Sequence, residues 1–207
     1  MKFPIHEMSE KRGADRTLTK AWQEDIQRAV EVMRHGGIIL YPTDTLWGIG
    51  CDATDDASIR RIFTLKQRAD AKAMLSLVDS DGRLQRYVRN VPEVAWQLID
   101  CAVRPLTIVY DGVQGLSPLL LAEDGSAGIR ITSEPFSREL CRRMQRAVVS
   151  TSANVSGIPA PCSFDEIADE ILQGVDYICT SRRNERNPSA SSVLKVGAGG
   201  EITILRK

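Results

Sequence analysis

Histidine and aromatic side chains are scarce in this sequence, and neither charge is in excess. Only His6 and His35 occur among the 207 residues, which nearly excludes a histidine-rich metal site and disfavours a Ser-His-Asp triad. Lys plus Arg and Asp plus Glu each number 27, and aromatic residues make up 5% of the chain. Proteins that bind nucleic acids in general are usually basic and offer aromatic stacking platforms, so the composition argues against that class.

Paired cysteines and long hydrophobic runs are absent as well. The five cysteines are odd in number and never form a C-x-x-C pair, which indicates reduced thiols in a reducing compartment. The longest apolar runs, such as residues 116–122, are too short to span a membrane, and the N-terminal residues lack the apolar core of a signal peptide. We therefore expect a cytoplasmic protein with no membrane association.

What the sequence does contain is enough apolar material for one folded domain. Hydrophobic residues make up 43% of the chain, and its length fits a single domain. Residues 1–16 are polar and show no periodicity, so we expect a flexible lead-in there. No linker rich in proline, glycine or serine interrupts the rest, which predicts one domain over residues 17–207.

The hydrophobic spacing predicts alternating helices and strands. Helices are expected at residues 18–35, 55–65, 92–103, 134–146 and 164–172. Strands are expected at residues 38–41, 74–78, 106–110, 127–131 and 147–150, and near Tyr177, Val193 and Ile202. Because these elements do not form strict βαβ units, we expect an α/β fold with a twisted mixed sheet and packed helices.

Two polar segments follow predicted elements and offer groups that bind ligands. The segment YPTDTLWGIG at residues 41–50 places hydroxyls and a carboxylate beyond a strand, although a tight strand exit would have the same composition. In the segment KQRADAK, Lys66 and Arg68 point to the same side if the chain is extended. A lysine beside an arginine suits a phosphate, whereas the alternative is a solvated charged loop.

Two further segments contribute candidate groups. The segment STSANVSG at residues 150–157 presents hydroxyls and the amide of Asn154, and it is either a nucleotide-binding loop or an ordinary Ser/Thr turn. Arg130 lies inside a predicted strand, where either an anionic ligand or a protein carboxylate would neutralise it. Ligands collect at strand ends in open α/β sheets, so we expect Lys66, Arg68, Ser152 and Asn154 to form one nucleotide-phosphate site. The sequence has neither a P-loop nor a Rossmann fingerprint.

In this order, the segments resemble the signatures of the YrdC-type family of threonylcarbamoyl-AMP synthases. The matching pieces are YPTDTLWGIG, KQR, PLT at residues 105–107, GIR ending at Arg130, and SANVSG from Ser152. The resemblance covers about residues 18–207 and fits the short, single-domain form of the family. It implies a YrdC-like fold around a concave basic cavity. The implied activity condenses L-threonine, bicarbonate and ATP into threonylcarbamoyl-adenylate and pyrophosphate, for the threonylcarbamoyladenosine modification of tRNA.

The resemblance also implies roles for individual residues. Lys66 and Arg68 are the expected catalytic residues. Threonine is expected to contact Thr45, Arg130, Ser152 and Ser191. The nucleotide is expected to contact Lys66, Arg68, Lys72, Ser126, Asn154 and Arg206. We expect Mg²⁺ to arrive on the phosphates of ATP, with no metal site built by the protein itself. Expected partners are tRNA or double-stranded RNA and proteins of the tRNA-modification pathway.

The sequence also departs from the family pattern. The departures are Gln67, Ala69, Lys72, Leu77, Cys162 and Lys195. They leave a second hypothesis open, a divergent paralogue that binds RNA or a nucleotide without this activity. In that case the basic stretch RRNER at residues 182–186 would contact RNA, whereas its simpler interpretation is a solvated charged loop.

Overall fold

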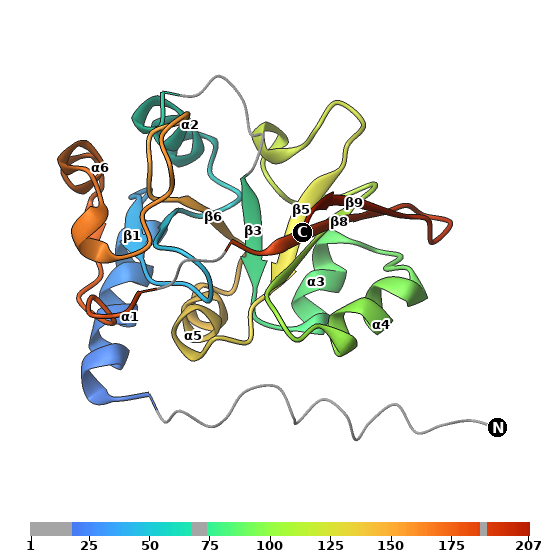
Figure 1. Cartoon of the computed structure of the whole chain (residues 1–207), viewed down its shortest axis with the longest axis horizontal. Helices are drawn as coiled ribbons and strands as arrows, with labels where there is room; N and C mark the ends of the chain where they lie inside the picture. The colour runs from blue at the N-terminus through green and yellow to red at the C-terminus, as the bar shows by residue number, and fades with distance from the viewer. Residues whose placement is uncertain (1–17, 68–73, 187–189) are drawn as a thin grey trace.

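A single mixed β-sheet organises the molecule (Figure 1). The structure is a computed structural model that describes residues 18–67, 74–186 and 190–207. In these ranges nine strands follow the order β7-β1-β2-β6-β3-β5-β4-β8-β9. The β1–β7, β3–β5 and β4–β8 pairs are parallel and the other pairs are antiparallel. The predicted α/β fold with a mixed sheet is confirmed.

The elements alternate along the chain as the hydrophobic spacing predicts. The helices are α1 (Lys20–Arg34), α2 (Asp56–Leu65), α3 (Asp81–Tyr87), α4 (Glu93–Cys101), α5 (Pro135–Met144) and α6 (Asp169–Gly174), with 3-10 turns at Pro118–Leu120 and Phe164–Glu166. The strands are β1 (Ile39–Tyr41), β2 (Gly48–Gly50), β3 (Leu75–Val78), β4 (Leu106–Tyr110), β5 (Ala127–Ile131), β6 (Val148–Ser152), β7 (Tyr177–Ile178), β8 (Ser192–Val196) and β9 (Ile202–Arg206).

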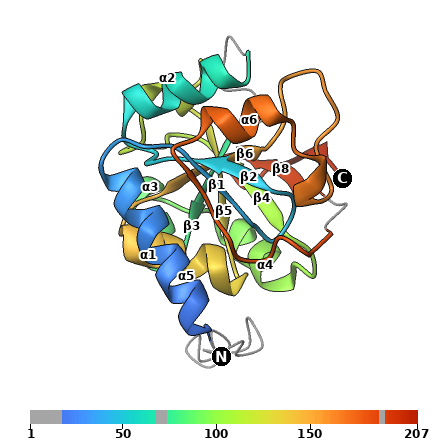
Figure 2. The ribbon, with the colours of Figure 1, turned by 90° about the vertical axis from the view of Figure 1, so that its left-hand side faces the viewer.

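Helices cover both faces of the sheet. Figure 2 shows α1 and α5 side by side on one face and α2 and α6 on the other. An edge-on contact between the rings of Trp22 and Phe136, 5.8 Å apart, joins α1 to α5. Helix α1 begins where the Thr19 side chain accepts a hydrogen bond from the backbone N–H of Trp22. It ends before Gly36, whose φ of +78° suits glycine.

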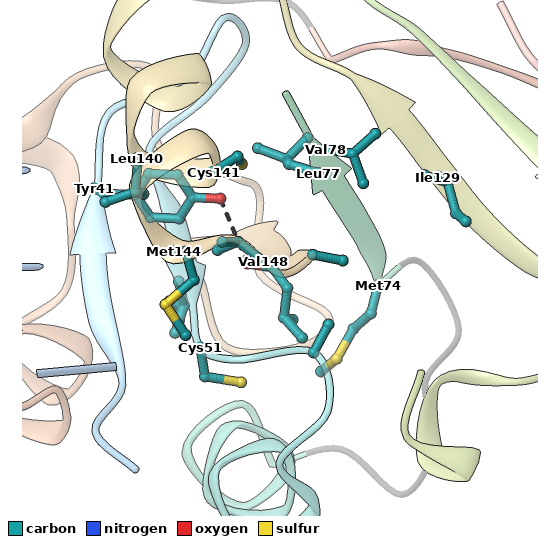
Figure 3. Close-up of a cluster of buried hydrophobic side chains, with 14 of the residues drawn as sticks. Tyr41, Cys51, Met74, Leu77, Val78, Ile129, Leu140, Cys141, Met144 and Val148 are labelled. Carbon is teal, nitrogen blue, oxygen red and sulfur yellow. Dashed lines mark hydrogen bonds between the residues drawn. The ribbon is translucent and has the colours of Figure 1, made fainter. Parts of the chain in front are cut away.

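The central core lies between the sheet and α5. Figure 3 shows the side chains that meet there from β1, β3 and α5, among them Tyr41, Leu77, Val78, Leu140, Cys141 and Met144. The Tyr41 hydroxyl donates to the carbonyl of Val149 at 3.4 Å. Burial raises the pKa of both the Tyr41 phenol and the Cys141 thiol, so neither group ionises at neutral pH.

Strand β2 is one of the differences from the sequence-based expectation, which placed residues 48–50 in a loop. All three residues pair with β1, and Gly48 and Ile49 also pair with β6 on the other side. Gly50 makes this possible, because a Cβ there would lie 2.7 Å from the ring of Tyr41. Strand β6 likewise extends to Ser152, two residues beyond its predicted end.

Helices also differ from expectation in two places. The single helix predicted at 164–172 is wrong, because the chain is extended at Ile167 and Ala168, where the side chain of Ile167 is buried. Helix α3 was not predicted, and it begins at the Ser80 cap. No helix within the described ranges is both long and apolar enough to cross a bilayer.

Candidate functional site

The loop between β1 and β2 is a tight, internally bonded turn. The Thr43 hydroxyl donates to the carbonyl of Leu46 at 2.7 Å and accepts from the backbone N–H of Thr45 at 3.0 Å. The two threonine hydroxyls are also 3.0 Å apart. The strand-exit interpretation therefore describes this loop, because these internal bonds fix the direction of Asp44 and Thr45. Ligand binding by the loop stays a prediction.

Lys66 ties the end of α2 to the loop that leaves β6. Its side chain is 2% exposed. Its ammonium donates to the carbonyl oxygens of Ser152 at 2.6 Å and Asn154 at 2.5 Å. The interpretation of Lys66 as part of a solvated loop is therefore wrong. The structure brings Lys66, Ser152 and Asn154 together, as predicted, and it places a buried positive charge beside the β6 exit.

The β6 exit also contacts the β1–β2 loop. The backbone N–H of Ala153 donates to the carbonyl of Trp47 at 2.9 Å. The Asn154 side-chain nitrogen donates to the carbonyls of Val155 and Ile158. Its buried Oδ1, in contrast, accepts no hydrogen bond from any residue that the structure describes. A hydrogen-bond donor from outside the described residues would satisfy this acceptor, and a bound ligand could supply such a donor.

Arg130 of β5 lies against the carboxylate of Asp44. The two side chains are 2% and 11% exposed, and Nη2 of Arg130 is 2.9 Å from Oδ1 of Asp44. A protein carboxylate therefore neutralises Arg130, one of the two alternatives left open by the sequence. The contact does not meet hydrogen-bond geometry, and within residues 18–67, 74–186 and 190–207 neither Asp44 Oδ1 nor Arg130 Nε has a hydrogen-bond partner.

Arg206 adds a third candidate group near Arg130. Its Nε donates to the carbonyl of Ser191 at 2.9 Å and its Nη2 donates to the Ser191 hydroxyl at 3.1 Å. That hydroxyl also lies 3.0 Å from Oγ1 of Thr107. Partial burial, and then the charge of Arg130, lower the pKa of Arg206. Two neighbouring guanidinium groups create a positive potential that favours an anion.

Ser126 lies away from Ser191, at the opposite end of the β4–β5 pair. Its hydroxyl and backbone N–H both donate to Oδ1 of Asp124. Asp124 in turn pairs with Lys195, whose ammonium is 2.6 Å away and also contacts Asp111. The unexpected base at Lys195 is thus neutralised by two carboxylates of the chain itself.

Three of the residues singled out in the KQRADAK segment, Arg68, Ala69 and Lys72, lie outside the described residues. Gln67 is described and has a φ of +51°, a left-handed conformation that favours glycine. Its side chain donates to Glu170 at 3.0 Å. Gln67, one of the departures from the family pattern, therefore adds a side chain at a backbone conformation that favours glycine.

The basic stretch at residues 182–186 differs from expectation at its first residue. Arg182 is only 7% exposed, and its guanidinium donates to Glu185 at 2.7 and 2.9 Å. Its Nη1 lies 3.0 Å from Oε1 of Glu134. The interpretation as a solvated loop is therefore wrong for Arg182, whereas it fits Arg186, which is 66% exposed. No local pattern distinguishes these arginines, because the difference arises from the long-range contact with Glu134.

Metal ligands do not gather in the described part of the chain. No group of three or more His, Cys, Asp or Glu side chains there is arranged to hold a metal ion. The candidate groups are instead the cations Lys66, Arg130 and Arg206, one carboxylate, and the hydroxyls and amide of two loops. Such a set binds anions and zwitterions through charge and hydrogen bonds.

Comparison with known proteins agrees with this description. The Sua5/YciO/YrdC family model, described as "Telomere recombination", matches residues 31–207. A "Threonylcarbamoyl-AMP synthase" of Psychromonas ingrahamii is 30% identical over 148 residues, which cover 70% of this chain and 78% of that protein.

Two solved structures have a fold similar to that of this chain. The crystal structure of E. coli YciO matches with a TM-score of 0.76 at 25% identity, and the match covers 89% of each chain. The crystal structure of P. abyssi Sua5 complexed with L-threonine also gives a TM-score of 0.76, at 24% identity. That match covers 86% of this chain and 52% of the other, so the chain spans about half the length of Sua5.

Proposed function

Because this chain belongs to the Sua5/YciO/YrdC family, we propose that it is a threonylcarbamoyl-AMP synthase, a nucleotidyltransferase acting on L-threonine, bicarbonate and ATP. The family resemblance predicted from the sequence motifs is confirmed by the match over residues 31–207. The activity is supported by the named relative and by the chemistry of the site.

One observation carries the proposal: the buried pair of Arg130 and Asp44. Among the described residues, neither the Nε–H of Arg130 nor Oδ1 of Asp44 has a hydrogen-bond partner, although Oδ1 lies 2.9 Å from Nη2 of Arg130. A free amino acid carries the complementary groups, a carboxylate that accepts and an ammonium that donates. Threonine is thus expected to place its carboxylate on Arg130 and its amino group toward Asp44 and Thr45.

The nucleotide is assigned to the β6 exit. Lys66 supplies positive charge there, and the Asn154 Oδ1 atom accepts a hydrogen bond from the ligand. Arg206 extends the positive potential toward the amino-acid site. The assignments of Ser152 and Ser191 to threonine, and of Ser126, Arg68 and Lys72 to the nucleotide, remain predictions that rest on the family resemblance.

The reaction has two steps that need no covalent nucleophile from the protein. The threonine amine attacks the carbon of bicarbonate, a C–N bond forms, and water leaves to give the carbamate. A carbamate oxygen then attacks the α-phosphorus of ATP, and pyrophosphate leaves with the electrons of the broken P–O bond. Holding three reactants together and neutralising their charge supplies such catalysis.

The proposed reaction also involves a metal ion, a cellular compartment and a tRNA acceptor. Mg²⁺ would bind with the phosphates of ATP, because this ion usually binds through substrate phosphates and retained waters. The free thiols of all five cysteines support a cytoplasmic location. The product would pass its threonylcarbamoyl group to tRNA with the help of tRNA-modification proteins.

The decisive experiment follows labelled L-threonine into product. The wild-type protein is expected to form threonylcarbamoyl-adenylate only when ATP, Mg²⁺ and bicarbonate are all present. The Arg130→Gln variant is expected to lose this activity, whereas Arg28→Gln, at an exposed helix position, is expected to retain it. ATP binding without product would favour the nucleotide-binding paralogue. An RNA affinity that falls steeply with salt and does not change when ATP is added would favour the RNA-binding alternative.

A further inference from the structure

Thr107 is a buried polar residue of β4, between the strands that carry two cations of the candidate site. It is 2% exposed. In the antiparallel pair of β4 and β5, Ile108 lies opposite Ile129. One residue further, toward the start of β4 and the end of β5, Thr107 comes opposite Arg130. Opposite residues of an antiparallel pair face the same side of the sheet, so Thr107 shares a face with Arg130. On its other side β4 pairs with β8, which pairs in turn with β9, the strand of Arg206.

A glycine of β5 fixes the direction of the Thr107 side chain. A Cβ on Gly128 would lie 3.4 Å from the methyl carbon of Thr107, so the methyl group packs over the glycine. The hydroxyl lies on the opposite side, toward β8, where Oγ1 is 3.0 Å from Oγ of Ser191. A threonine side chain has few allowed rotamers, so the packing of its methyl group holds its hydroxyl against Ser191.

Ser191 is held a second time by Arg206. The guanidinium donates through Nε to the carbonyl of Ser191 at 2.9 Å and through Nη2 to its hydroxyl at 3.1 Å. Ser191 itself is 2% exposed. Its hydroxyl oxygen therefore has two polar neighbours, a guanidinium that can only donate and the hydroxyl of Thr107.

The pair of hydroxyls holds one hydrogen more than its contacts use. Each hydroxyl carries one hydrogen, and only one of the two can lie in the 3.0 Å contact between Thr107 and Ser191. Arg206 supplies no acceptor for the other. Within the described residues neither hydroxyl has a further acceptor. A buried donor without an acceptor is costly, so the second hydrogen suits an acceptor atom of a ligand.

We propose that Thr107 is a positioning residue that donates to Ser191 and so directs the hydroxyl hydrogen of Ser191 toward an oxygen of the amino-acid substrate. The Ser191 oxygen then accepts from both Thr107 and Arg206, which uses its two lone pairs and leaves its own hydrogen for the ligand. The assignment of Ser191 to the amino acid rests on the proposed function, whereas the donor order within the hydroxyl pair does not. Thr107 is not expected to touch the substrate, because its single hydroxyl hydrogen is taken up by Ser191.

Two substitutions at this position separate the hydroxyl from the packing. Thr107→Val removes the hydroxyl but keeps a methyl group over Gly128, so the protein is expected to fold. Thr107→Ser keeps the hydroxyl and is expected to retain most of the function. Thr54→Val is the matched control, since it removes a threonine hydroxyl that donates to Asp52 at 2.7 Å. Asp52 lies beside the first residue of β6, at the other end of that strand from Ser152.

The first measurement needs no substrate, because solution NMR detects hydroxyl protons that exchange slowly with water. In the ligand-free wild-type protein we expect a protected Thr107 hydroxyl proton, assigned by its loss in Thr107→Val, and a rapidly exchanging Ser191 hydroxyl proton. Thr54→Val is expected to leave this pattern unchanged. Any other pattern in the wild-type protein, such as a protected Ser191 proton with rapid exchange at Thr107, would overturn the proposal.

The second measurement is a double-mutant cycle in steady-state kinetics. Ser191→Ala is expected to raise the KM for threonine about tenfold, the loss of one charge-assisted hydrogen bond. Thr107→Val is expected to raise it about fivefold or more, with kcat within about twofold of wild type and recovery in Thr107→Ser.

A residue that acts only through Ser191 has nothing left to position once that hydroxyl is gone. Adding Thr107→Val to Ser191→Ala is therefore expected to raise the KM by no more than about twofold. Effects that multiply in the double variant, or no recovery in Thr107→Ser, would contradict a positioning role. Absence of product in the wild-type protein would refute the proposed function and leave the NMR result to decide the role of Thr107.

Discussion

At the scale of single residues, Lys66 shows how a charged side chain can serve both folding and chemistry. Its ammonium is buried and donates to two carbonyl oxygens of the β6 exit. The loop that presents Ser152 and Asn154 thus depends on the same positive charge that the phosphates of ATP require. A substitution here is expected to affect stability and turnover together.

Lys66→Met tests this dual role. Loss of the ammonium leaves two carbonyl oxygens without this donor, which is expected to lower the free energy of unfolding by about 1–3 kcal/mol. Turnover is expected to fall by about 100-fold or more, because a charge near the transferred phosphates is lost. Urea unfolding measures the first effect, and initial rates at a temperature where the variant is folded measure the second.

The matched control for Lys66 is Lys20→Met. Lys20 is an exposed helical lysine whose side chain is 91% accessible and lies 3.8 Å from Glu24. Its loss is expected to change the free energy of unfolding by less than about 0.5 kcal/mol and to leave turnover unchanged. Turnover of the Lys66→Met protein within threefold of wild type would show that its charge does not assist the reaction.

The residues of the site were predictable from sequence to different degrees. Lys66, Ser152 and Asn154 were grouped correctly, because each follows the end of a predicted helix or strand. The burial of Arg182 was missed, since its contact Glu134 lies far away in sequence. Buried ion pairs of this kind are set by tertiary packing, and a short pattern such as RRNER contains no sign of them.

At the scale of elements, the site depends on how closely β1, β2 and β6 approach one another. Strand β2 consists of Gly48, Ile49 and Gly50, and it lies between the other two strands. A Cβ on Gly50 would meet the ring of Tyr41 at 2.7 Å and the carbonyl oxygen of Val149 at 2.8 Å. The Tyr41 ring therefore packs across β2 only because residue 50 is glycine.

Gly50→Ala is expected to lower the free energy of unfolding by about 1–3 kcal/mol, the cost of an extra methyl group in a packed core. The change would also shift the β1–β2 loop, so threonine binding should weaken. Urea unfolding of the variant and of Gly82→Ala provides the comparison. Gly82 lies in α3 with open space around it. Alanine at this position should raise the free energy of unfolding by about 0.5–1 kcal/mol. Equal stability of the two variants would contradict the packing argument.

Elements with a clear hydrophobic pattern were predictable, whereas α3 and β2 were not. The predicted positions of α1, α2, α4, α5 and most strands agree with the structure to within a few residues, because each has a clear hydrophobic period. Helix α3 has only seven residues, and β2 has only three, two of them glycine. Their conformations are set by pairing and packing with distant segments, which a local pattern does not contain.

At the scale of the whole molecule, the sheet order gathers the site from the entire chain. Asp44 follows the first strand, Arg130 lies in the fifth, and Arg206 lies in the last. The net charge is zero, yet the candidate groups of the site include three cations, Lys66, Arg130 and Arg206, and one carboxylate, that of Asp44, which contacts Arg130. A local excess of positive charge in a neutral protein favours small anionic ligands over a long polyanion such as RNA.

Binding of the substrates should therefore be coupled. The adenylate can form only if the carbamate reaches the α-phosphate, so the threonine and nucleotide sites must lie next to each other. Threonine with bicarbonate is expected to raise the affinity for an ATP analogue with a methylene group between the α- and β-phosphates, which cannot release pyrophosphate. A coupling free energy of about 1–3 kcal/mol is typical of interacting sites.

The rise in Tm on adding ligands measures this coupling. A ligand that binds only the folded state raises the free energy of unfolding by RT ln(1 + [L]/Kd). The rise in Tm with analogue, threonine and bicarbonate together should exceed the sum of the rises with the analogue alone and with threonine and bicarbonate alone. Arg130→Gln should abolish the excess but keep the rise with the analogue alone. Strict additivity in the wild-type protein would mean that the two ligands bind independently, and the shared adenylate-forming site would then be wrong.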